Sequence, residues 1–192
     1  SLHDALPISS SELDDHLLLF KHRQLVRIGL SDLGRRPDPL EVGRSLSDLA
    51  DLVLGEIVAD LAAGWAQGDA TRPGFTLAVF ALGKLGMQAM DYGSDLDLLF
   101  VFEPHDERSP TLVREDALRV ARQLNARLEQ RLRGVRLYEV DMRLRPSGNR
   151  GLLVSSLDGF RSYHARSLEV WERLALVWMR PVTEQAFTTS PP

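Results

Sequence analysis

Hydrophobic residues in the first third of the chain recur every three or four positions, which is the spacing of an amphipathic helix. The pattern predicts one helix over residues 17–33 and a second over residues 40–65, separated by a turn that contains two prolines. We therefore expect residues 17–72 to form a helical lead-in. Residues 1–10 are polar, are broken by Pro7 and show no periodicity, and we expect residues 1–16 to form a loose leader that need not be native to the domain.

Shorter apolar runs, typical of strands, follow the lead-in. Residues 75–82 form an apolar run bounded by glycines, which predicts a buried strand. Similar runs predict strands over residues 95–102 and 135–144, and a short fourth strand over residues 152–154. A long amphipathic helix is predicted between the second and third strands, over residues 111–132.

The last part of the chain returns to a helical pattern, with helices predicted over residues 157–164 and 168–178. The order of elements predicts an α+β fold with a small mixed sheet. We expect residues 73–155 to form its core, residues 156–182 to add C-terminal helices to the same unit, and residues 183–192 to form an unanchored tail.

Composition narrows the possible functions. The 192 residues are enough for one sizeable core, and the net charge of -4 provides no overall basic field for a long nucleic acid. The absence of cysteine excludes disulfides and thiolate metal sites. The N-terminal residues lack the features of a signal peptide, and no apolar run is long enough to span a bilayer. We therefore expect a cytoplasmic protein.

Charged side chains interrupt the predicted second strand. Asp95 and Asp97 flank Leu96, and side chains alternate between the two faces of a strand. The two carboxylates therefore point the same way, while Leu96 and Leu98 point into the core. Such a pair is common on solvated surfaces. Here it lies in a strongly apolar strand, where an unpaired charge is costly, and this favours a functional role.

The predicted third strand repeats the arrangement, with Glu139, Asp141, Arg143 and Arg145 on one face. Clustered carboxylates repel each other unless a cation lies between them, and oxygen-only ligands suit Mg²⁺ or Mn²⁺ rather than zinc. Asp141 and the aspartate pair of the second strand therefore form a candidate site for two metal ions. Two ions about 3.5–4 Å apart can clamp the attacking and leaving oxygens of a phosphoryl transfer. The two arginines would hold phosphate.

A turn with two glycines, residues 83–86 (GKLG), follows the first predicted strand. Gly83 would let the backbone approach a phosphate, and Lys84 would add a positive charge beside the N-terminus of a helix. The turn is not a P-loop, because the Gly-Lys-Ser/Thr ending is missing.

Three blocks of the sequence are similar to the glutamine-synthetase adenylyltransferase family: residues 81–86 (ALGKLG), 93–100 (GSDLDLLF) and 138–148 (YEVDMRLRPSG). The resemblance covers roughly residues 17–182. It implies the DNA polymerase beta-like nucleotidyltransferase fold, in which a glycine turn, Ser-Asp-X-Asp and a third aspartate follow one another along the chain.

The resemblance implies Mg²⁺-dependent transfer of AMP from ATP to a tyrosine of glutamine synthetase, which regulates nitrogen assimilation. Members of this family carry two similar catalytic halves, and this chain resembles one of them. The adenylylating half is the closer match through YEVD, DLD and GLLV, whereas Met87 and Gly93 depart from its pattern. The other half releases ADP by phosphorolysis of adenylyl-tyrosine, and it stays open as the alternative.

The resemblance also implies roles for single residues. The two metal ions would be held by Asp95 and Asp97 and completed by Asp141, which would also act as the base or position it. Phosphate would be contacted by Gly83, Ser94, Lys84 and the two arginines of the third strand. Ser94 could instead only cap a turn, and one arginine could simply pair with Glu139.

The partner that the resemblance implies is glutamine synthetase, with a PII-type signalling protein bound through regions outside this chain. Two other interpretations stay open. The chain could be a nucleotidyltransferase for another acceptor, such as RNA or an antibiotic, or a catalytically degenerate regulatory or partner-binding module. The acidic balance disfavours the first, and the three intact aspartates disfavour the second.

Overall fold

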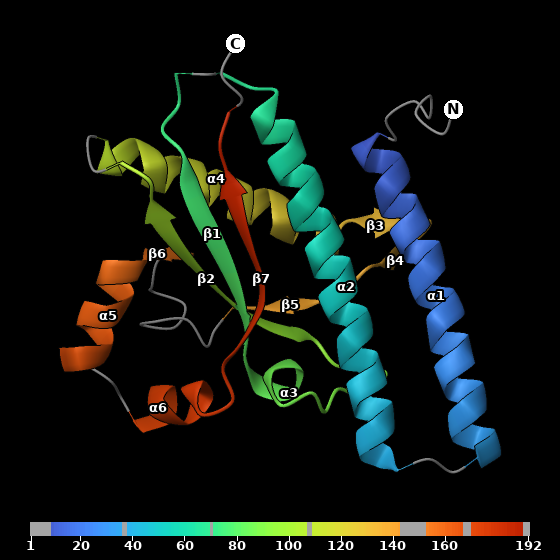
Figure 1. Cartoon of the computed structure of the whole chain (residues 1–192). Helices are drawn as coiled ribbons and strands as arrows, with labels where there is room; N and C mark the ends of the chain where they lie inside the picture. The colour runs from blue at the N-terminus through green and yellow to red at the C-terminus, as the bar shows by residue number, and fades with distance from the viewer. Residues whose placement is uncertain are drawn as a thin grey trace, which may run out of the picture.

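The computed structural model describes residues 9–35, 38–69, 71–106, 109–142, 153–166 and 170–189. In chain order the elements are α1 (Ser10–Arg35), α2 (Pro39–Ala66), β1 (Phe75–Ala81), α3 (Gly83–Gly86), β2 (Leu96–Pro104), α4 (Pro110–Glu129), β3 (Arg131–Leu132), β4 (Val135–Arg136), β5 (Val140–Asp141), β6 (Val154–Ser156), α5 (Leu157–Arg166), α6 (Val170–Leu176) and β7 (Arg180–Phe187). Helices and one mixed sheet share a core, so the predicted α+β class is confirmed (Figure 1).

The sheet is built around β2. On one side β2 pairs antiparallel with β1, which pairs antiparallel with β7 at the edge. On its other side β2 pairs in parallel with two short strands, first β5 and further along β6. The short β3 and β4 form a separate hairpin. The N-terminal end of β2 is therefore the place where β5 and α3 meet the sheet (Figure 1).

Apolar side chains on both faces of β2 form two cores, which is why its sequence reads as a continuous apolar run. Leu96, Leu98 and Phe100 belong to the main core, which also takes in the buried faces of α2 and α4. Leu99 and Val101 point to the opposite face and pack with Leu157, Phe160, Leu176 and Met179. The predicted inward orientation of Leu96 and Leu98 is confirmed, since both are fully buried.

The lead-in consists of α1 and α2, which lie side by side (Figure 1). Asp38 caps α2 by accepting a hydrogen bond from the backbone N–H of Leu40. The predicted loose leader is wrong for residues 10–16, because α1 already begins at Ser10. Leu13 packs against the main core, and a buried ion pair between Asp14 and Arg127 of α4 holds the same turn of the helix.

The C-terminal tail is a second correction. The structure pairs β7 with β1 as far as Phe75 and Phe187, so the predicted unanchored tail is wrong for residues 183–187. Phe187 is fully buried and stacks on Phe75, with 5.0 Å between ring centroids. Most other positions of β7 are partly or fully exposed, as on an edge strand, and its sequence therefore lacks the alternation that predicts a strand.

The predicted third strand over residues 135–144 is only partly correct. Arg133 and Gly134 adopt positive φ in the turn of the β3–β4 hairpin, and the chain rejoins the main sheet only at Val140. The other predicted strands and helices are found within a few residues of their expected bounds. Within the described ranges, no helix is long and apolar enough to cross a membrane.

Candidate active site

Two of the predicted aspartates lie next to each other on neighbouring strands. In the parallel pairing of β2 with β5, Asp97 is the register partner of Asp141, and the backbone N–H of Leu96 donates to the carbonyl of Glu139 over 2.9 Å. Neighbouring strands lie about 4.8 Å apart, and paired residues project to the same face. Two carboxylates that are 44 positions apart in the sequence are thus brought together by backbone pairing.

Asp95 lies just before β2 and is exposed, two residues from the half-buried Asp97. All three predicted aspartates therefore belong to one end of the sheet. In the part of the chain that the structure describes, no group of three or more His, Cys, Asp or Glu side chains is placed to hold a metal ion. The structure thus brings a carboxylate pair together, with Asp95 as its near neighbour in the chain.

Gly83 makes room for the Asp97 carboxylate. Its φ is +53°, and a Cβ atom at this position would lie 2.0 Å from Oδ2 of Asp97. The neighbouring Leu82 N–H donates to the Asp97 carbonyl over 2.9 Å, which fixes the end of β1 against β2. The first glycine of the GKLG turn is therefore required by an aspartate side chain, because any other residue would displace it.

Ser94 closes the turn that leads into β2. Its hydroxyl donates to Oδ1 of Asp91 (2.8 Å) and accepts from the Asp91 backbone N–H (3.0 Å), while Gly93 N–H donates to the same carboxylate oxygen. The structure thus gives Ser94 the role of a turn cap. Asp91 was not among the predicted site residues, although an Asp two residues before a Gly is the signal of an Asx turn.

Lys84 reaches from α3 to the other oxygen of Asp91, with 2.6 Å between Nζ and Oδ2. The hydrogen bond and charge of Asp91 raise the pKa of Lys84, and the charges of Asp95 and Asp97 add to the effect. In return, hydrogen bonds from Lys84 and Ser94 lower the pKa of Asp91. Lys84 is therefore an exposed cation within the field of the acidic end of the sheet.

The segment just before β5 is held by α1. The ammonium group of Lys21 donates to the carbonyl of Leu137 and lies 3.7 Å from the centre of the Tyr138 ring. Burial lowers the pKa of Lys21 to about 8 and raises the pKa of Tyr138. Neither residue was predicted to take part, because no local pattern links segments so far apart in the sequence.

Glu139 points away from the buried segment and pairs with Arg136 over 3.1 Å. Glu139 therefore has an arginine partner that was not predicted, and the alternative in which Arg143 or Arg145 pairs with it is not tested. The two arginines expected to hold phosphate, Arg143 and Arg145, lie outside the described residues.

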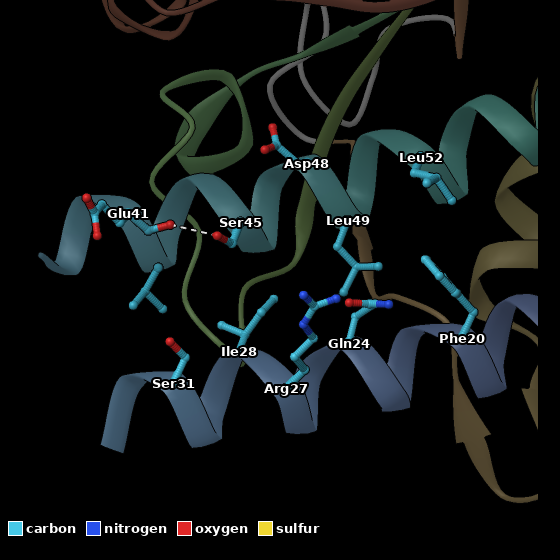
Figure 2. A pocket seen from close by; sticks show the side chains of 11 residues that line it. Phe20, Gln24, Arg27, Ile28, Ser31, Glu41, Ser45, Asp48, Leu49 and Leu52 are labelled. Atoms are coloured by element: carbon cyan, nitrogen blue, oxygen red, sulfur yellow. Dashed lines mark hydrogen bonds between the residues drawn. The ribbon is translucent and has the colours of Figure 1, made fainter. Parts of the chain in front are cut away.

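A groove of about 480 Å³ runs between α1 and α2 (Figure 2). Its walls are formed by apolar residues such as Ile28 and Leu49 and by polar residues such as Arg27 and Asp48. Arg27 and Ile28 of α1 and Leu49 of α2 point towards the facing helix, whereas the Asp48 carboxylate points away from α1 (Figure 2). None of the predicted site residues lines it. The groove is therefore separate from the carboxylate pair.

The fold and the site define an α+β domain that carries paired carboxylates at one end of a mixed sheet. The sequence profile of the glutamate-ammonia ligase adenylyltransferase family matches residues 4–190. The chain belongs to this family.

Curated relatives agree with this assignment. The chain is 37% identical to the bifunctional glutamine synthetase adenylyltransferase/adenylyl-removing enzyme of Chromobacterium violaceum, over 90% of this chain and 19% of the relative. It is 36% identical to the enzyme of the same name from Caulobacter vibrioides, over 83% and 16% respectively. It is 32% identical to the enzyme of the same name from Mesorhizobium japonicum, over 89% of this chain and 18% of the relative. The chain thus spans less than a fifth of the length of these relatives.

Proposed function

We propose that this chain is a nucleotidyltransferase domain of the DNA polymerase beta-like type, which transfers AMP from ATP to a tyrosine of glutamine synthetase. The observation that carries the proposal is the register pairing of Asp97 with Asp141 at the end of the sheet, beside Gly83. The names of the relatives supply the nucleotide chemistry and the protein substrate. The paired carboxylates support locating this chemistry at that end of the sheet.

The donor chemistry fits magnesium. Asp95, Asp97 and Asp141 offer only oxygen atoms, and Mg²⁺ is usually bound by one or two carboxylates together with substrate phosphates. Because the substrate phosphates supply part of the ligands, the protein needs to provide only a pair of neighbouring carboxylates and not a complete ligand set. When bound, the ions would stabilise the charge on the transferring phosphorus group. Manganese has the same preference for oxygen ligands.

The residues of the chain would then divide the remaining tasks. A tyrosine hydroxyl has a pKa near 10, so a carboxylate close to it must accept or orient its proton, and we assign this role to Asp141. Lys84 would offset negative charge on the triphosphate from its exposed position on α3. Arg143 and Arg145 would do the same from the segment after β5, and the Gly83 backbone would contact phosphate. The Ser94 hydroxyl would contact phosphate by exchanging its hydrogen bond to Asp91 for one to the nucleotide.

The direction of the reaction is part of the proposal. We favour the adenylylating direction on the resemblance of the YEVD, DLD and GLLV blocks. The relatives are named for both activities, so phosphorolysis of adenylyl-tyrosine is the second candidate. We also propose that the domain works in the cytoplasm, where its nucleotide is found, and that a PII-type protein regulates it through regions outside this chain.

The test is to incubate the chain with Mg²⁺ in two reactions: unmodified glutamine synthetase with ATP, and adenylylated glutamine synthetase with phosphate. Release of pyrophosphate identifies the adenylylating direction, and release of ADP identifies the other. Combined Asp95→Asn and Asp97→Asn substitutions should abolish the metal-dependent reaction. Asp158→Asn, an isosteric change at an exposed carboxylate on α5, is the matched control and should leave it intact. Full activity of the double variant would refute the proposed site.

A further inference from the structure

The short helix α6 exposes apolar side chains on the face that points to solvent. Val170, Leu174, Val177 and Trp178 are 57–73% exposed. Their spacing of four, three and one residues places them along one side of the helix and the turn that continues it. A surface helix normally presents polar residues on this side. These four side chains are mostly exposed, so they contribute little to packing within the described chain.

The opposite side of α6 is firmly seated. Leu176 and Met179 pack into the second core with Leu82 and Leu99. Glu172 is buried and accepts a hydrogen bond from the hydroxyl of Tyr163 on α5 over 2.7 Å. The helix therefore has a fixed orientation, and its outer apolar face is presented by a rigid support.

The turn at the end of this face lies one short helix away from the carboxylate pair. A Cβ atom on Gly86 would lie 2.3 Å from the carbonyl oxygen of Trp178, so the end of α6 abuts the last residue of α3. The first residue of α3 is Gly83, which touches the Asp97 carboxylate. Gly83 and Gly86 are three positions apart, which corresponds to about 4.5 Å at the rise of an α-helix. Figure 1 shows α6 next to α3, at the end of the sheet where β2 begins.

We propose that the α6 face, made of Val170, Leu174, Val177 and Trp178 and extended by the exposed Met87, is the surface on which the protein substrate docks. The inference rests on the proposed function, and it concerns where the acceptor protein is held. A nucleotide is polar and charged, and four adjacent exposed apolar side chains would contribute little to its recognition. A folded protein with an apolar surface around its acceptor tyrosine would bury them, and Trp and Met are enriched at such interfaces.

The position of the face explains how a tyrosine would reach the site. A protein bound against α6 would contact Met87 and the turn after α6, one short helix away from Asp97. Its acceptor side chain could then extend to the carboxylate pair while the rest of the protein stays outside. The other edge of the site, towards Lys84 and Asp91, would remain open for the triphosphate.

The experiment compares two double variants of the chain. Val170→Ser with Leu174→Ser removes the centre of the α6 face. Val26→Ser with Leu30→Ser makes the same pair of changes, at the same spacing and with 62–67% exposure, on α1. The α2 helix and the sheet lie between α1 and α6 (Figure 1). Both variants should unfold at the same temperature as the parent chain, because neither pair is buried.

The first readout is steady-state AMP transfer to glutamine synthetase. We expect the α6 variant to raise KM for glutamine synthetase on the order of tenfold, which is the loss of about 1.4 kcal/mol of binding free energy. Its KM for ATP and its kcat should be unchanged, and the α1 variant should match the parent. An unchanged KM for glutamine synthetase, or equal effects of both variants, would overturn the inference.

The second readout does not depend on catalysis. Immobilised glutamine synthetase should bind the Asp97→Asn chain, and adding the α6 substitutions should weaken this binding by a similar factor. Binding that requires the α6 face without any AMP transfer would refute the proposed function and leave the docking surface standing. AMP transfer that is unaffected by the α6 substitutions would overturn the docking surface and leave the proposed function standing. A large drop in the unfolding temperature of the α6 variant would show that the face packs within the chain, and would also overturn the inference.

Discussion

Asp97 and Asp141 are register partners in the parallel pairing of β2 with β5. Their relative position is therefore set by the backbone of two strands rather than by a loop. Residues on paired strands are held in place more precisely than residues on a loop. The proposed reaction needs two carboxylates close together and therefore benefits from this precision. The pairing involves only two residues of β5, so the site depends on what holds that short strand in position.

Substituting Asp141 should separate a catalytic role from a general effect of charge. We expect Asp141→Asn to lower the rate of AMP transfer by about 10²-fold or more, because a positioned base contributes roughly that much. Glu139→Gln provides the control two residues earlier, at an exposed side chain paired with Arg136. It should leave the rate within a factor of two or so of the parent, as is usual for exposed surface changes. Single-turnover assays at saturating ATP measure the effect, and equal rates for the two variants would argue against the assignment.

Gly83→Ala should damage the site from the backbone side. The new methyl group would meet the Asp97 carboxylate, and the residue would have to keep a positive φ. Gly134→Ala is the matched control, since Gly134 also has positive φ but a Cβ atom added there, in the hairpin turn, would have no other atom within 4 Å. We expect both to lose about 1–2 kcal/mol of stability from the backbone conformation. Only Gly83→Ala should also lose AMP transfer. Urea unfolding measures the loss of stability in both variants, and the transfer assay measures the loss of activity that is expected for Gly83→Ala alone.

Patterns within short stretches of sequence predicted those features of the fold that depend only on neighbouring residues. The apolar run of β2 and the inward orientation of Leu96 and Leu98 follow from strand alternation and burial. The Asp-X-Asp pair and the glycine turn were visible for the same reason. β7 was missed because it is an edge strand anchored mainly by Phe187, and one buried residue gives no period.

Contacts between distant segments could not be predicted in the same way. The pairing of Asp97 with Asp141 depends on the register of two strands, and no pattern in the single sequence fixes that register. The contact of Lys21 with Tyr138 joins α1 to the segment before β5, and each residue alone looks ordinary. The turn formed by Asp91 is a different case, because residues 91–94 carry the local signal of a turn and the structure confirms it.

Arg127 should be a major source of stability for the helical lead-in. It is nearly buried and pairs with Asp14 of α1 (2.6 Å) and Asp60 of α2 (2.5 Å). Arg127→Met leaves these carboxylates without their cation, and we expect a loss of about 3 kcal/mol in unfolding free energy. Arg133→Met removes an exposed arginine 3.8 Å from Asp15, and it should have no measurable effect. Urea denaturation of both variants tests the contrast, and equal midpoints would contradict it.

Lys84 should matter for the nucleotide and not for folding. Its ion pair with Asp91 is exposed on both sides, and such pairs contribute little to stability. We therefore expect Lys84→Met to unfold at the same temperature as the parent chain while its KM for ATP rises. Lys84→Arg keeps the charge and should recover part of the affinity. A variant that loses stability but keeps its KM for ATP would show that Lys84 is structural.

The buried Lys21 predicts a pH dependence of stability. Burial lowers its pKa from 10.5 to about 8, so between these values the unfolded chain binds more protons than the folded chain. Stability should therefore rise with pH in this window, because the cost of burying the charged form, fully present below pH 8, is progressively removed. The Lys21→Met variant lacks this contribution. The unfolding free energy of the parent relative to Lys21→Met should thus increase from pH 7 to about 9.5, a range that stays below the tyrosine titration.

Lys84→Met serves as the control for this measurement. The pKa of Lys84 is raised, so the stability linked to its charge is fully present below its unfolded value of 10.5 and is lost only above it. The difference between the parent and Lys84→Met should therefore stay constant from pH 7 to about 9.5. Urea unfolding of the three chains at matched ionic strength gives both comparisons. A difference for Lys21→Met that stays flat or falls with pH would mean that the Leu137 carbonyl and the Tyr138 ring stabilise the charged lysine by more than burial costs it.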